Sequence, residues 1–237
     1  QLLRRGAVNL SFAGRLENGV KTGRGTEYHE NGVAAFEGTF ADGLYTGEGT
    51  LRDEAGNVLY EGAFQGGLYE GTGRLYADNA LVYEGEFAQG LYDGEGKLYE
   101  GGQLVYEGDF AAGQRTGQGK AYEDGALVYE GGFQDGLYSG SGRLYYADGT
   151  VRAECATFAD GLIDGACVLY YENGQTKYEG TFSQGEASGQ GTLYAEDGTR
   201  TYYGGFEAGL KSGTGTDYYP SGAKEYEGAF SQGAVSY

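Results

Sequence analysis

The sequence lacks methionine and has a single proline and a single histidine, His29, among its 237 residues. One proline excludes collagen and proline-rich linkers. The missing methionine predicts that the chain starts downstream of its true N-terminus, and both ends are expected to be trimmed from a longer chain. A closed zinc site needs four nitrogen or sulfur ligands, and His29 with the two cysteines supplies at most three. No metal and no cofactor are therefore expected.

Basic residues and long apolar runs are also scarce. The chain has 16 Lys and Arg against 35 Asp and Glu, which gives a formal net charge of −19 at pH 7. Such a charge repels phosphate backbones and anionic lipid surfaces. Nucleic acid is therefore not expected as a partner, and direct binding to anionic lipid is disfavoured. No run of about 18 apolar residues is present, so no transmembrane helix is expected.

Glycine and aromatic residues are abundant and recur with a fixed period. The chain has 49 Gly, 24 Tyr and 11 Phe, and internal repetition of this kind predicts tandem structural units. A phenylalanine recurs every 23 to 25 residues, and a glycine and then a Gly-x-Gly pair follow it. An aromatic-Glu-Gly triplet precedes most of these phenylalanines. The series is Phe40, Phe64, Phe87, Phe110, Phe133, Phe158, Phe182, Phe206 and Phe230.

The consensus Y-E-G-x-F-x-x-G-x-x-x-G-x-G-x-L-Y resembles the MORN (membrane occupation and recognition nexus) repeat family. The resemblance covers residues 14–237, with the last repeat incomplete, and residues 1–13 are expected to form a lead-in. Residues 170–180 resemble the bacterial variant of the repeat, so a bacterial protein is expected. The resemblance implies roles in tethering and protein assembly, and it favours a membrane-proximal or extracytoplasmic location.

The alternation of residue types predicts two short strands in each repeat, such as Tyr83–Phe87 and Gly94–Tyr99, with a glycine-bearing loop from Ala88 to Asp93 between them. Asn-Gly and Asp-Gly pairs, such as Asn173-Gly174, predict turns between repeats. No segment has helical periodicity. The sequence therefore predicts an all-β protein. Its expected form is an elongated, twisted single-layer antiparallel sheet of about ten tandem 23–25-residue hairpins, similar to a solenoid.

Glycine weakens an isolated strand, so its recurrence inside strands needs a steric reason. We expect the Tyr and Phe rings of neighbouring strands to lie over the bare backbone at these positions. A register in which Phe87 faces Gly94 would place Gly85 opposite Gly96.

The same register places Cys155 opposite Cys167, because the two cysteines replace these glycines in one repeat. A disulfide between Cys155 and Cys167 is compatible with that placement. The alternative is a pair of small buried thiols that fill adjacent glycine gaps.

Tyrosine rows are the best binding candidates, because Tyr offers a large, rigid and amphipathic contact surface. One row is expected at the loop tips, and its alternative role is cross-strand packing. This candidate binding surface consists of Tyr45, Tyr69, Tyr92 and Tyr138. Cross-strand packing is favoured for a second row, which begins at Tyr28 and lies on the opposite face from a leucine stripe.

Catalytic chemistry has weak support in the sequence. The triplet glutamates share one face about 10 Å apart and are equivalent to one another, which favours a solvated acidic face over a catalytic pair. His29 lies at a turn without a partner signature and is expected to be exposed. The sequence predicts a non-catalytic scaffold for protein interaction or assembly, including self-association through its apolar stripe or an open end. The alternatives are a glycan, cell-surface or membrane-proximal binding module and an accessory region of a larger enzyme.

Overall fold

The structure is a computed structural model and describes residues 10–236. Most of the predicted lead-in, residues 1–9, lies outside the described residues. The described part contains 21 strands and no helix, and every strand pairing given for it is antiparallel, for example that of β5 with β6. The all-β fold of tandem hairpins is therefore confirmed. The chain forms two compact units, Gln1–Gln114 and Arg115–Tyr237.

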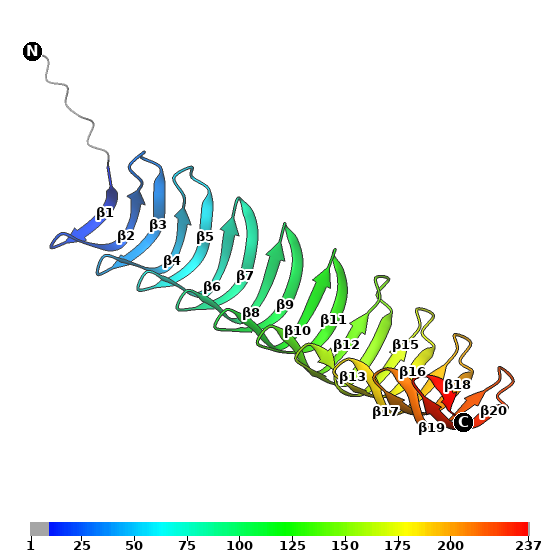
Figure 1. The fold of residues 1–237 in the computed structure, drawn as a ribbon. Coiled ribbons are helices and arrows are strands. Elements are labelled where there is room, and N and C mark those ends of the chain that lie inside the picture. Colours follow the sequence, from blue (N-terminus) through cyan, green and yellow to red (C-terminus); the bar gives the residue numbers. More distant parts are fainter. Residues whose placement is uncertain (1–9, 237) are drawn as a thin grey trace, which may run out of the picture. The chain divides into compact units, whose positions relative to one another are not determined.

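The N-terminal unit is a meander in which consecutive strands lie side by side in chain order (Figure 1). Its strands are β1 (Phe12–Glu17), β2 (Val20–Tyr28), β3 (Ala34–Ala41), β4 (Leu44–Arg52), β5 (Val58–Gln65), β6 (Leu68–Ala77), β7 (Ala80–Ala88), β8 (Leu91–Glu100) and β9 (Gln103–Ala111).

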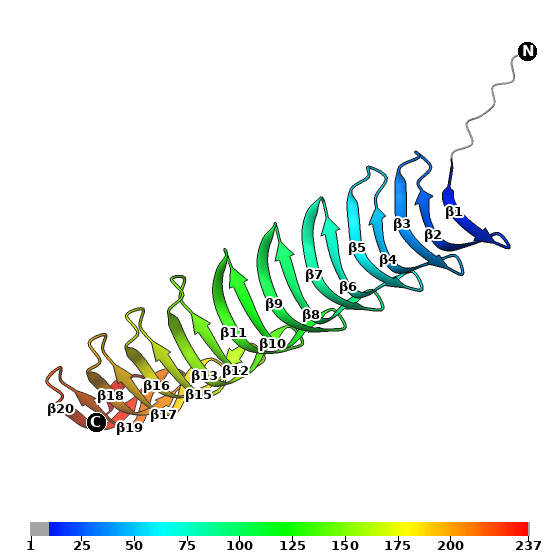
Figure 2. The ribbon, with the colours of Figure 1, turned by 180° about the vertical axis from the view of Figure 1, so that it is seen from behind.

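The C-terminal unit repeats the same arrangement, which Figure 2 shows from behind. Its strands are β10 (Gln114–Glu123), β11 (Ala126–Gln134), β12 (Leu137–Tyr145), β13 (Val151–Ala159), β14 (Leu162–Ile163), β15 (Gly165–Tyr170), β16 (Thr176–Ser183), β17 (Glu186–Tyr194), β18 (Arg200–Glu207), β19 (Leu210–Tyr218), β20 (Lys224–Ser231) and β21 (Ala234–Ser236).

The strands are longer and the turns shorter than the sequence predicts. The loop expected from Ala88 to Asp93 is wrong, because β7 extends to Ala88 and β8 begins at Leu91. Gln89 and Gly90 alone form the turn, with φ values of 51° and 84°. Two consecutive residues with positive φ give a type I′ turn, whose twist matches that of the flanking strands.

The predicted register is right at the glycine pair and wrong beyond it. Gly85 pairs with Gly96, as expected, but Phe87 pairs with Tyr92 rather than with Gly94. The register shifts between Gly85 and Phe87, and Gly94 has a φ of 98°. A bulge at this glycine takes up the residues that the short turn leaves over.

The core is a row of aromatic rings that lie over paired glycines. Tyr60 has no exposed surface, and its ring covers Gly73, where an added Cβ would lie 2.5 Å from Tyr60 Cζ. The Tyr60 hydroxyl donates to the carbonyl oxygen of Ala63 at 3.0 Å, which satisfies the buried polar group. The ring of Phe64 meets Tyr60 edge to face, with the centroids 5.0 Å apart. The rings therefore lie over the strand glycines, as the sequence predicts.

These contacts define two faces of each unit. The aromatic face carries the buried rings, such as Tyr60 and Phe64, together with Leu75, which pairs directly with Tyr60. The polar face carries the triplet glutamates, such as Glu61, and their cross-strand partners, such as Arg74.

Candidate functional site

The four candidate tyrosines lie on the aromatic face and not at loop tips. Tyr69 is the second residue of β6, and its ring stacks on Tyr60 with the centroids 3.8 Å apart and the planes 13° apart. Tyr45, Tyr92 and Tyr138 stack in the same way on the triplet ring of the preceding strand in the same hairpin. All four are half-buried, so each forms an accessible second layer over a buried ring. Their role in binding remains a prediction.

The hydroxyl groups of these tyrosines differ in their partners. Tyr45 donates to Glu27 at 3.1 Å, and burial together with this carboxylate raises the pKa of Tyr45 to about 12. Burial also raises the pKa of Tyr69 and of Tyr92. Within residues 10–236, the hydroxyls of Tyr69 and Tyr92 make no hydrogen bond. A ligand on the aromatic face could therefore use them as donors or acceptors.

In one repeat of each unit, a partly buried ion pair replaces the tyrosine and the leucine that stand at the positions of Tyr69 and Leu75. In the N-terminal unit, Lys21 stands at the position of Tyr69, and Glu27 stands at the position of Leu75. Lys21 Nζ lies 2.5 Å from Glu27 and 5.4 Å from the centre of the Phe12 ring. The joint replacement keeps the position filled, because the cation stacks on the rings and the anion pairs with the cation.

Lys211 and Asp217 make the same joint replacement in the C-terminal unit, with 2.5 Å between Nζ and Oδ1. Lys211 Nζ lies 4.6 Å from the centre of the Tyr202 ring. The sequence interpretation missed both pairs. Their signal is the simultaneous change of two repeat positions that lie six residues apart on one strand, Lys21 and Glu27 on β2 and Lys211 and Asp217 on β19.

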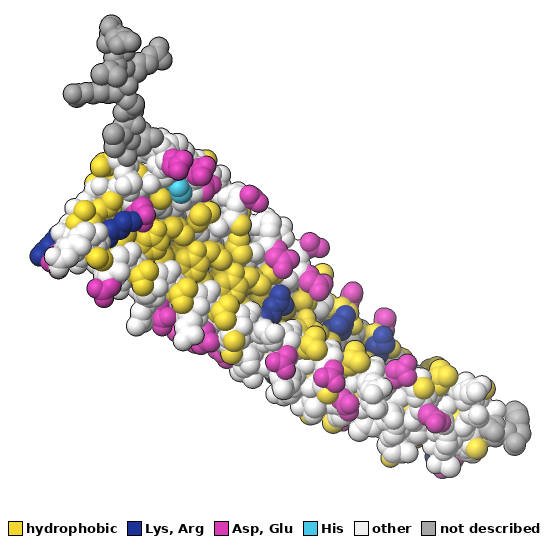
Figure 3. Space-filling view, turned by 60° about the vertical axis from the view of Figure 1, so that its left-hand side comes forward, with side chains coloured by type: hydrophobic (Ala, Val, Ile, Leu, Met, Phe, Trp, Pro, Cys, Tyr) yellow, Lys and Arg dark blue, Asp and Glu magenta, His cyan; other side chains and the backbone are white. Residues whose placement is uncertain are grey.

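The N-terminal unit combines an apolar surface with an acidic border. Figure 3 shows hydrophobic side chains gathered over one face of this unit, with Asp and Glu side chains around them. Residues 10–114 contain 18 Asp and Glu but only six Lys and Arg. Leu44, Leu68 and Leu91, which precede the candidate tyrosines, are each about half exposed.

Cations partly neutralise the glutamates of the polar face. Arg74 lies between Glu61 and Glu84 in the register, and its Nη2 is 2.7 Å from Glu84. Arg143 pairs in the same way with Glu154 in the C-terminal unit. The side chains of these glutamates are partly exposed, as the prediction of a solvated acidic face requires, and in these repeats cations lie beside them. Such exposed pairs contribute little to stability.

The sequence predicts an exposed His29 side chain, and this prediction is wrong. His29 is half-buried, and its Nε2 lies 3.0 Å from the carbonyl oxygen of Arg52, 23 residues further along. A carbonyl only accepts, so Nε2 carries the proton. Tyr146 donates to the carbonyl oxygen of Tyr170 from the equivalent position. These side chains connect the turn of one repeat to that of the next.

The described part of the chain contains no candidate metal site. Among residues 10–236, no group of three or more His, Cys, Asp and Glu side chains is placed to hold a metal ion. The same residues include no helix that is long and apolar enough to cross a membrane.

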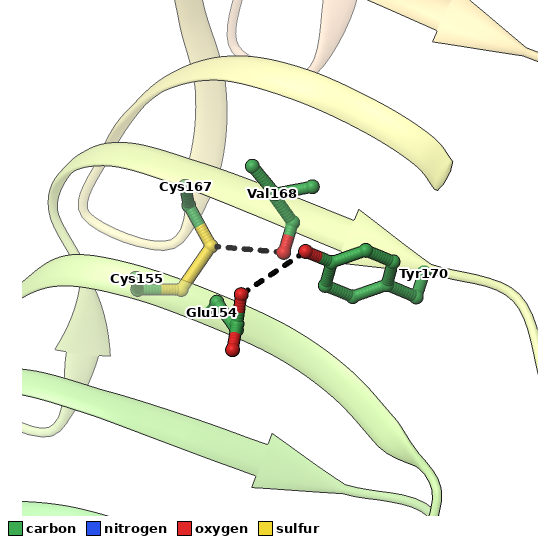
Figure 4. Close-up of a disulfide and its surroundings, with 5 residues drawn as sticks. All are labelled: Glu154, Cys155, Cys167, Val168 and Tyr170. Atoms are coloured by element: carbon green, nitrogen blue, oxygen red, sulfur yellow. Dashed lines mark hydrogen bonds between the residues drawn. A yellow bond between two sulfur atoms is a disulfide. The ribbon is translucent and has the colours of Figure 1, made fainter. Parts of the chain in front are cut away.

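Cys155 and Cys167 pair across β13 and β15, and the structure joins them by a disulfide (Figure 4). Ala153 occupies the repeat position that Tyr60 occupies in another repeat. The ring that would cover the Cys155–Cys167 pair is therefore missing. The two cysteine side chains are buried and occupy the place of the missing ring. Formation of the bond in the protein remains a prediction that free-thiol counting tests.

This architecture defines a tandem β-hairpin repeat protein, in which a ring lies over a glycine pair in the repeats other than the one with Ala153. The pattern of the MORN repeat family matches residues 12–33, 36–58, 60–80, 83–102, 106–126, 129–151, 178–200 and 202–224, and a variant of the MORN repeat matches residues 163–184. The chain therefore belongs to the MORN repeat family. The matches leave out residues 152–162, where Ala153 and Cys155 interrupt the triplet. No curated protein matches the chain.

Proposed function

We propose that the chain is a non-catalytic interaction scaffold and that the aromatic face of its N-terminal unit binds a protein partner. The main support is the half-buried pair Tyr69 and Tyr92, whose hydroxyls have no hydrogen bond within the described residues. Aromatic side chains with a polar end are enriched in protein interfaces. MORN repeats are commonly interaction modules, and this chain's membership of the family agrees with such a role.

The charge of the N-terminal unit indicates the chemistry of the partner. With 18 carboxylates and six cations in residues 10–114, this unit attracts basic polypeptides and repels acidic ones. A second copy of the chain would carry the same negative charge. The charge therefore favours a different protein, with apolar side chains among basic ones, over self-association.

Differential capture with matched variants tests this proposal. The probe variant is Tyr69→Ala with Tyr92→Ala, which the fold should tolerate because Ala187 occupies the same repeat position in β17. The control is Tyr76→Ala, which removes a half-buried tyrosine from the polar face. We expect a specific partner to be retained by the wild type and by the control, and to be lost with the probe variant. Equal retention by all three proteins would contradict the proposal.

A further inference from the structure

One repeat of the C-terminal unit has a different polar face. Tyr203 in β18 stands at the position of the triplet glutamate, which the first repeat replaces with Ala13, and Tyr203 is 49% exposed. Its cross-strand neighbours are Thr192 and Thr216, whereas Glu154 has Arg143 as its neighbour. At this repeat an exposed ring flanked by hydroxyl groups replaces the ion pairs.

Tyr203 lies at an open groove of about 320 Å³. Gln190, Thr214 and Thr216 also line the groove, and Gly204, Gly215 and Gly228 contribute bare backbone. Within the lining, Glu227 is the only charged side chain, and it is paired with Lys224 at 2.6 Å. The groove is therefore nearly neutral on a chain that is otherwise strongly acidic.

The polar side chains of this groove have unused hydrogen-bonding capacity. Thr216 is only 7% exposed, and its hydroxyl makes no hydrogen bond within residues 10–236. The described part has no fully buried side-chain oxygen or nitrogen without a partner, so the Thr216 hydroxyl reaches the groove. The side chains of Gln190 and Thr214 also lack a hydrogen bond within the described residues. The Thr216 hydroxyl is therefore open to the groove and free to bond to a molecule that enters it.

The chemistry of the groove selects a class of ligand. The ring of Tyr203 offers a flat apolar surface with a polar end, and the threonine hydroxyls and the Gln190 amide each both donate and accept. A sugar has the complementary arrangement, because it presents C–H groups on one side of its ring and hydroxyl groups around the edge. A net charge of −19 disfavours acidic ligands. We propose that this groove of the C-terminal unit binds a neutral saccharide, which stacks on Tyr203 and hydrogen-bonds to Thr216 and Gln190.

Saturation-transfer NMR on the full chain tests the proposal, with cellotriose and tri-N-acetylchitotriose as the neutral probes and sialyllactose as the acidic one. We expect millimolar binding of at least one neutral probe, with the largest transfer to its ring C–H protons and none to sialyllactose. Tyr203→Glu restores the residue of the other repeats, so it should fold normally and bind at least roughly tenfold more weakly. Tyr203→Phe should retain binding, and Thr216→Val should weaken it roughly threefold or more.

Tyr219→Glu is the matched control, because Tyr219 is similarly exposed, at 47%, but is not part of the groove lining. Binding that is lost in Tyr203→Glu and kept in Tyr219→Glu supports the site. The proposal is overturned if the folded wild type transfers no saturation to either neutral probe. It is equally overturned if Tyr203→Glu and Tyr219→Glu bind alike. The site lies in the C-terminal unit, so neither result bears on the protein-binding face of the N-terminal unit.

Discussion

The repeat that contains Ala153 is a natural test of the relation between a ring and its glycine pair. In other repeats a Tyr or Phe ring covers two glycines. In this repeat Ala153 replaces the ring, and Cys155 and Cys167 replace the two glycines. If the ring and the bare glycines require each other, Ala153→Tyr should destabilise the native protein. The same change should stabilise a Cys155→Gly, Cys167→Gly variant.

The structure gives the magnitudes. An added Cβ at Gly142, the glycine next to Cys155 in the sheet, would lie 2.6 Å from Tyr129 Cζ, so a tyrosine at position 153 cannot nest above two cysteines. Overpacking of this kind costs about 1–3 kcal/mol. Removal of a disulfide that spans 12 residues costs about 3 kcal/mol. Burial of a tyrosine ring over two restored glycines contributes about 2–3 kcal/mol, so the triple variant should regain most of what the double variant loses.

Urea denaturation followed by circular dichroism measures all four proteins. A reducing agent serves as the control, because it should lower the midpoint of the wild type and leave the triple variant unchanged. The reasoning is refuted if Ala153→Tyr has the same effect in both backgrounds. The outcome also tests the disulfide, because two free thiols in the native wild type would remove the reducing-agent effect.

Three further predictions concern alkaline pH and two local contacts. Burial raises the pKa of Tyr129 and of Tyr178 to about 12, above the ordinary value near 10. The resulting stabilisation is complete below about pH 10 and is lost as the pH rises toward 12, so the urea midpoint should fall over that range, and a constant midpoint would contradict the burial. His29→Ala removes the hydrogen bond to Arg52 and should cost about 1 kcal/mol, whereas an unchanged midpoint would show that the connection between turns contributes nothing. Lys211→Tyr with Asp217→Leu restores the common Tyr–Leu combination and should be neutral or stabilising. Lys211→Ala alone should destabilise the protein, because it leaves Asp217 partly buried without its cation. Equal melting temperatures for the two variants would contradict the coupling between Lys211 and Asp217.

Much of the fold could be predicted from the sequence because the same pattern of residues recurs in nine complete repeats. The period of 23 to 25 residues and the alternation around Phe87 give the strands and the pairing of Gly85 with Gly96. The same register places Cys155 opposite Cys167. Each of these results follows from side-chain periodicity, which a strand records directly.

The turn and the functional surfaces were less accessible. Gln89 and Ala112 adopt φ values of 51° and 47°, which residues of these types rarely do. The signal for the two-residue turn lies in other repeats, where Asn18-Gly19 and Asp42-Gly43 occupy the same position. The bulge at Gly94 then shifted the register of Tyr92 and placed it on the aromatic face.

The unpaired hydroxyl of Thr216 depends on what surrounds that one threonine in space. Threonine stands at the same repeat position elsewhere, as Thr26 and Thr50, without being buried. The residue type and its place in the repeat were therefore insufficient to find the groove at Tyr203.

A double-mutant cycle between Tyr60 and Gly73 tests the central claim most directly. Gly73→Ala adds a Cβ that would lie 2.5 Å from Tyr60 Cζ, while Tyr60→Ala removes the obstructing ring. We predict that Gly73→Ala lowers the free energy of unfolding by about 2 kcal/mol or more with Tyr60 in place and has little effect in the Tyr60→Ala background. A coupling energy near zero, with Gly73→Ala equally costly in both backgrounds, would contradict the claim that the strand glycines exist to accommodate the rings.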